Sequence, residues 1–115
     1  MSELKPNVLL IDADADFSST IVARLISDGY GLRWLKLLSL GGMRAEEGYR
    51  IILLDLTTPG ASPQEFISEL KRRWPGALIV STTSGHVTTN GINFYLPKPF
   101  TANELSEVLA NLSAV

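Results

Sequence analysis

The amino-acid sequence predicts an α/β fold, a doubly wound parallel sheet with helices on both faces. Two observations lead to this prediction. Four-residue apolar runs recur at residues 8–11, 51–54 and 77–80, and apolar runs without alternation are typical of strands that are buried on both faces. Amphipathic helical patterns lie between these runs, and alternating strands and helices favour parallel strands joined by helical crossovers.

Length and composition fit one domain spanning residues 1–115. A chain of 115 residues with 45% hydrophobic and 19% charged content can bury about two-thirds of its unfolded surface in one core. The net charge of -2 provides no basic patch, so nucleic-acid binding is not expected. The absence of cysteine excludes disulfides and thiolate chemistry. Neither a signal peptide nor a membrane span is recognisable, so a cytoplasmic protein is expected.

The first half of the chain supplies two less regular elements. Asp14 or Asp16 can cap a first helix, which Gly29 ends. Residues 32–35 form a plausible second strand. Residues 37–47 are predicted to form a short helix, although its paired glycines weaken it by about 1 kcal/mol each.

Capping signals mark the later helices. Ser62 followed by Pro63 and Glu65 predicts a capping box at the start of one helix, and Thr101 with Glu104 predicts another for the closing helix. Between them, residues 92–96 are expected to form a last strand, which the following proline places at the edge of the sheet.

Polar residues stand at the ends of the predicted strands, namely Asp12, Asp55, Thr82 and Lys98. In parallel sheets ligands bind at the carboxyl ends of strands. Two carboxylates, a hydroxyl and an ammonium at one edge suit phosphoryl transfer to or from a carboxylate, with Asp55 as nucleophile and Mg²⁺ held by the acids. The alternative is that Asp55 only turns the chain before Pro59.

With these motifs in register, residues 7–112 resemble the receiver domain of bacterial two-component response regulators. The resemblance implies a flavodoxin-like five-stranded sheet in the order 2-1-3-4-5. It rests on an acid ending the first strand, an aspartate four residues before a proline, a threonine after the fourth strand, a Lys-Pro pair after the fifth, and an aromatic residue three positions before that lysine; these are Asp12, Asp55 with Pro59, Thr82, Lys98 with Pro99, and Tyr95.

The resemblance also implies a role for each residue. Asp55 is the expected phosphoacceptor, and Mg²⁺ is expected on Asp12, Asp55 and the backbone of Thr57. The residues expected to contact the phosphoryl group or to switch with it are Thr82, Lys98 and Tyr95. A signalling module rather than an enzyme is expected, with a histidine kinase or another signalling protein as partner, a homodimer, and an output domain outside this chain.

Two departures leave the mode of signalling open. Ala13 stands where the family has a second acid, so Mg²⁺ binding is expected to be weak or absent. Residues 83–93 are rich in Ser, Thr and Gly, so the fourth helix is expected to be shortened or missing. The chain is therefore either a phosphoacceptor or an atypical, degenerate receiver that acts as a protein-interaction or dimerisation domain. Because close carboxylates repel, Asp55→Asn is expected to stabilise the metal-free domain if the site is retained.

A remote alternative is a haloacid-dehalogenase-like phosphatase. Asp12 and Asp14 have the spacing of the nucleophile and acid of that family. The later acidic pair of such a metal site is missing, and the chain is short for that family. The single histidine, His86, is expected in a solvent-facing loop.

Overall fold

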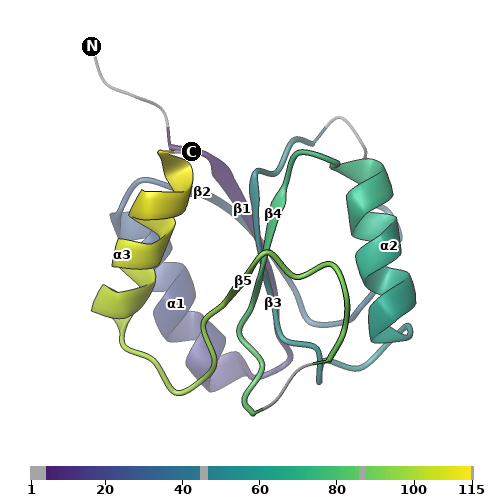
Figure 1. The fold of residues 1–115 in the computed structure, drawn as a ribbon. Helices are drawn as coiled ribbons and strands as arrows, with labels where there is room; N and C mark the ends of the chain where they lie inside the picture. Colours follow the sequence, from purple (N-terminus) through teal and green to yellow (C-terminus); the bar gives the residue numbers. More distant parts are fainter. Residues whose placement is uncertain (1–4, 45–46, 86–87, 115) are drawn as a thin grey trace.

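The computed structural model describes residues 5–44, 47–85 and 88–114. Its centre is a parallel five-stranded sheet in the order β2-β1-β3-β4-β5 (Figure 1), which confirms the predicted strand order. The strands are β1 (Asn7–Ile11), β2 (Gly31–Leu35), β3 (Ile51–Leu54), β4 (Leu78–Ser81) and β5 (Phe94–Tyr95).

Helices cover both faces of this sheet, as the doubly wound fold requires. In Figure 1, α1 (Ala15–Ser27) and α3 (Ala102–Ser113) lie on one side, and α2 (Pro63–Arg73) lies on the other. Among the described residues no helix is both long and apolar enough to cross a bilayer.

The apolar runs are explained by two cores, one on each face of the sheet. Successive side chains of a strand point to opposite faces, so a run covered on both sides must be apolar throughout. On the α2 side, Leu9 and Ile52 pack with Phe66. On the other side, Leu10 and Leu53 pack with residues of α1 and α3.

The prediction of a helix over residues 37–47 was wrong. No helix occurs in the described residues 36–44 and 47–50. This segment is extended in part. Leu38 and Leu40 are buried on either side of an exposed Ser39, which is the two-residue period of a strand. Leu38 also forms an isolated parallel bridge with Gly60, and this long-range pairing decides against a helix.

The close approach at this bridge requires a glycine. The amide of Leu38 donates to the carbonyl of Pro59 at 2.7 Å, and the amide of Ala61 donates to the carbonyl of Leu38 at 3.1 Å. A Cβ at position 60 would lie 2.7 Å from the nitrogen of Leu38, and Gly60 has a φ of 134°. Residues 36–44 will be called the strap.

No fourth helix is present in the described residues 83–85 and 88–93, which confirms the prediction of a shortened or missing helix. His86 lies outside the described residues. The segment instead lies against α2, where the Gln64 side chain accepts from the amide of Asn90 at 3.2 Å and donates to its carbonyl at 3.3 Å. The side chain of Asn93 accepts from the amide of Ile79 at 2.8 Å, so regular pairing is limited to Phe94–Tyr95.

The helix caps were predicted with one error. Asp14 accepts from the amide of Phe17 at 3.1 Å, and the Thr101 and Glu104 capping box is complete. Ser62 precedes α2, but its side chain makes no capping hydrogen bond, so the predicted Ser62 capping box was wrong.

Candidate functional site

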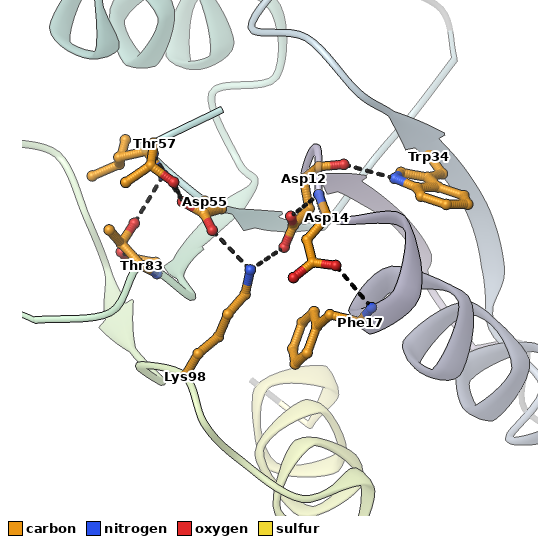
Figure 2. Close-up of polar contacts among 10 residues, drawn as sticks. Asp12, Asp14, Phe17, Trp34, Asp55, Thr57, Thr83 and Lys98 are labelled. Atoms are coloured by element: carbon orange, nitrogen blue, oxygen red, sulfur yellow. Dashed lines mark hydrogen bonds and ion pairs between the residues drawn. The ribbon is translucent and has the colours of Figure 1, made fainter. Parts of the chain in front are cut away.

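An ammonium group lies between two carboxylates at the carboxyl edge of the sheet (Figure 2). Lys98 Nζ is 2.6 Å from Asp12 Oδ2 and 2.8 Å from Asp55 Oδ2. Asp12 follows β1 and Asp55 follows β3, and these strands are neighbours, while Lys98 follows the edge strand β5. The fold therefore brings together three of the residues that the sequence places at strand ends.

Asp12 is buried and is hydrogen-bonded through both its side chain and its backbone. It is 1% exposed, and its Oδ1 accepts from the amide of Asp14 at 2.8 Å. Its backbone carbonyl accepts from Trp34 Nε1 at 3.0 Å. These hydrogen bonds fix the turn that leads from β1 into α1, while Asp12 Oδ2 has no hydrogen bond and contacts Lys98 as an ion pair.

Asp55 is hydrogen-bonded through both carboxylate oxygens. Its Oδ1 accepts from the Thr57 amide at 2.8 Å and from the Thr57 hydroxyl at 2.6 Å. Burial by itself would raise the pKa of Asp55, but the hydrogen bonds from Lys98 and Thr57 outweigh it and hold the pKa below its ordinary value. Asp55 is therefore ionised at neutral pH.

The same contacts act on Lys98 in the opposite sense. Burial would lower the pKa of the lysine, but its close contacts with the carboxylates of Asp12 and Asp55 raise the pKa above its ordinary value. Since 14% of the side chain is exposed, the ammonium remains charged in a largely desolvated place. Two negative charges and one positive charge then give the cluster a net charge of -1.

The two residues predicted to act as a switch, Thr82 and Tyr95, differ in how far they are exposed to solvent. Thr82 is 1% exposed, and its hydroxyl is buried without a hydrogen-bond partner. Its carbonyl accepts from the amide of Lys98 at 3.3 Å, which joins the end of β4 to the loop that carries the lysine. Tyr95 is 51% exposed. Their switch role stays a prediction.

Thr83 is a contact residue that the sequence analysis missed. Its hydroxyl oxygen accepts from the amide of Leu56 at 2.8 Å and from the hydroxyl of Ser81 at 3.0 Å. These bonds tie the end of β4 to the residue that follows Asp55. The run of hydroxyl residues at 81–84 was the available signal, but it does not say which hydroxyl faces β3.

Phe17 was missed too. Lys98 Nζ lies 4.4 Å from the centroid of its ring, a distance at which a cation is attracted to an aromatic face. An apolar residue at a helical spacing gives no sign of contact with a lysine.

At the two acids expected to hold Mg²⁺, Asp12 and Asp55, the structure places a lysine ammonium. In the described part of the chain no group of three or more acidic or histidine side chains is placed to hold a metal, and Ala13 adds no side-chain oxygen. The two carboxylates that do converge share the Lys98 ammonium at 2.6 and 2.8 Å. Mg²⁺ prefers six oxygen ligands, so an ion entering here would have to displace the ammonium.

Comparison with solved structures finds receiver domains over nearly the whole chain. The non-phosphorylated HemR receiver domain of Leptospira biflexa is 21% identical, with a TM-score of 0.83 and 96% of each chain covered. The receiver domain of a sensor histidine kinase of Pseudomonas aeruginosa, described with a magnesium ion in its active-site cleft, is 24% identical, with a TM-score of 0.81 and coverage of 96% of this chain and 99% of that one. The BeF3-activated DrrB receiver domain is 16% identical, with a TM-score of 0.79 and coverage of 96% and 99%.

The sequence matches no protein-family model, and no curated protein matches it. The class that the structure defines is therefore one of fold: this chain has the fold of response regulator receiver domains. Among the described residues the sheet carries three helices, and no helix follows β2 or β4.

The phosphatase alternative receives no support from the position of Asp14. Its Oδ1 is bonded to the amide of Phe17 at the start of α1. This hydrogen bond accounts for Asp14 as the cap of α1.

Proposed function

We propose that this chain is the receiver domain of a two-component response regulator and that Asp55 accepts a phosphoryl group from a histidine kinase. The observation that carries this proposal is the contact of Lys98 with Asp12 and Asp55 at the carboxyl edge of a receiver-type sheet. Asp55 follows a buried strand, its side chain is 10% exposed, and it is ionised, as a nucleophile must be.

The proposed step forms an acyl phosphate. A carboxylate oxygen of Asp55 attacks the phosphorus of a phosphohistidine, the new O–P bond forms as the P–N bond breaks, and the imidazole leaves with the electron pair. Lys98 is 2.8 Å from Asp55 Oδ2, so its ammonium is placed to offset the charge on the transferred group. The Thr57 amide and hydroxyl orient the carboxylate through its other oxygen.

Incubation with acetyl phosphate and Mg²⁺, followed by intact-mass measurement, tests this proposal. A gain of one phosphoryl mass that is absent in Asp55→Asn is expected. Since Asp12 is also a strand-end carboxylate, Asp12→Asn serves as the matched control, which should slow the gain without moving it to another residue. An unmodified wild-type chain under conditions that phosphorylate a known receiver would reject the acceptor role.

A second candidate is a protein-interaction or dimerisation module that works without phosphorylation. One observation favours it: Ala13 contributes no side-chain oxygen beside Asp12. Such a module would show no mass gain, and its oligomeric state in sedimentation would be the same with and without acetyl phosphate. These proposals include a histidine kinase as partner, a homodimer and a separate output domain.

A further inference from the structure

The surroundings of Lys98 contain one group that the proposed function does not use, the ring of Phe17. Figure 2 shows this ring beside the lysine side chain, on the α1 side of the site. Lys98 Nζ contacts Asp12 Oδ2 at 2.6 Å and Asp55 Oδ2 at 2.8 Å, and it lies 4.4 Å from the Phe17 ring centroid. The ammonium is therefore held by the ends of two strands and the first turn of a helix.

Phe17 is itself fixed from two directions. Its backbone amide is bonded to the Asp14 cap at 3.1 Å. Its ring meets the ring of Phe100 edge to face, with centroids 5.2 Å apart and planes at 89°. Because Phe100 is only two residues beyond Lys98, the aromatic pair restrains the loop that carries the lysine as well as the ammonium.

The position that Lys98 Nζ occupies is also the position that a second cation would need. The two carboxylate oxygens that converge both contact the ammonium. A divalent ion binding between them must first move the lysine, so any group that holds the lysine there weakens the binding of the ion. A ring face attracts a cation more strongly when water is excluded, and 86% of the Lys98 side chain is removed from solvent, since 14% is exposed.

We propose that Phe17 is a positioning residue that holds the Lys98 ammonium between Asp12 and Asp55 as the resident cation of this site, and thereby sets how readily Mg²⁺ enters. This inference rests on the proposed function, since it concerns the site proposed to accept the phosphoryl group. It assigns regulation of that site to a residue that the proposed phosphoryl transfer does not use.

The test compares the wild type with Phe17→Leu, which removes the ring, and Phe17→Tyr, which keeps it. Mg²⁺ is titrated and followed through the amide chemical shifts of Asp12 and Asp55. Loss of an aromatic contact with a cation is expected to tighten Mg²⁺ binding by about two- to fivefold in Phe17→Leu, and Phe17→Tyr is expected to stay near the wild type. The matched control is Phe94→Leu, the same change at an exposed position of β5, which should leave the affinity unchanged.

A second readout requires no metal. Ring currents should shift the ε-methylene proton signals of Lys98 upfield in the wild type and in Phe17→Tyr, and this shift should disappear in Phe17→Leu. Unshifted signals in the wild type would overturn the proposal, and this remains decisive if Phe17→Leu does not fold. Equal Mg²⁺ affinity in the wild type and Phe17→Leu, or an equal gain in Phe17→Leu and Phe94→Leu, would overturn it as well.

Neither readout includes a phosphoryl donor. A chain that shows the expected Lys98 signals and affinities but no mass gain with acetyl phosphate would reject the acceptor role of Asp55 alone. A chain that gains a phosphoryl group but shows unshifted Lys98 signals would reject the role of Phe17 alone.

Discussion

The carboxylate side of the site, formed by Asp12, Asp55 and Lys98, differs from its hydroxyl side, formed by Thr82 and Tyr95, in how completely the polar atoms are bonded. Three of the four carboxylate oxygens accept hydrogen bonds, and the fourth, Asp12 Oδ2, forms an ion pair with Lys98, whereas the Thr82 hydroxyl is buried with neither kind of partner and Tyr95 is half exposed. A buried hydroxyl without a partner destabilises a protein by about 1–3 kcal/mol. The charged groups are thus already in a favourable arrangement, and the unmet hydrogen bond lies with the threonine.

Removing the Lys98 ammonium should have the largest effect on the stability of the domain. Lys98→Met leaves two buried carboxylates close together without a counterion, so we expect a loss of about 3 kcal/mol in the free energy of unfolding. Urea denaturation at neutral pH measures it. Lys71→Met, at an exposed lysine of α2, is the control and should change stability little. Added Mg²⁺ should restore part of the loss in Lys98→Met, and a loss that Mg²⁺ does not change would argue against competition between the two cations.

Neutralising Asp55, the proposed phosphoacceptor, should have the second-largest effect on stability. Asp55→Asn removes a charge that Lys98 and Thr57 stabilise, so we expect a loss of about 2 kcal/mol, opposite in sign to the stabilisation expected from the sequence. Because the pKa of Asp55 is lowered in the folded state, its contribution is present above its unfolded pKa near 3.9 and disappears as the pH falls through the folded value. Stability curves of the two proteins against pH should therefore converge in acid. A more stable Asp55→Asn domain at neutral pH would show that repulsion between the carboxylates dominates.

Adding a carboxylate at position 13 should change Mg²⁺ affinity rather than the stability of the fold. Ala13→Asp adds an oxygen ligand beside Asp12, so we expect Mg²⁺ to bind at least tenfold more tightly, or about 1.4 kcal/mol. Calorimetric titration of both proteins measures this gain, with Ala13→Asn as the uncharged control. Tight binding by the wild type and no gain in the variant would contradict the assignment of these ligands.

The smallest effect concerns the hydroxyl side. Thr82→Val replaces the unpartnered hydroxyl with a methyl group of similar size, so we expect a gain of about 1 kcal/mol. Thr83→Val, which removes an acceptor for the Leu56 amide, should instead lose stability. Thermal denaturation of the pair compares the two neighbours directly, and a destabilised Thr82→Val would mean that the hydroxyl is bonded in solution.

Much of the fold was predictable because its central strands are buried on both faces. Residues 8–11 and 51–54 carry no polar side chain, and runs this short have the length of strands rather than of helices. The strap was not predictable, since Leu37, Leu38 and Leu40 satisfy a helical as well as an extended spacing. The contact between Leu38 and Gly60, 22 positions apart in sequence, decides between them.

The candidate site, like the fold, was predictable in part. Asp12, Asp55 and Lys98 are found from sequence because each follows a strand, and the parallel sheet brings strand ends together. Phe17 and Thr83 were missed because their roles depend on the direction of a side chain, which spacing along the chain does not give. Ser62 shows the same limit, since a capping sequence was present but its side chain makes no capping hydrogen bond.

The glycine under the strap limits how this protein can diverge. Any other residue at position 60 would place a Cβ 2.7 Å from the nitrogen of Leu38 and 2.8 Å from its oxygen, so a side chain here and the strap in its present place exclude one another. A chain without this glycine would have to cover the α2 face of the sheet in another way, for example with a helix between β2 and β3.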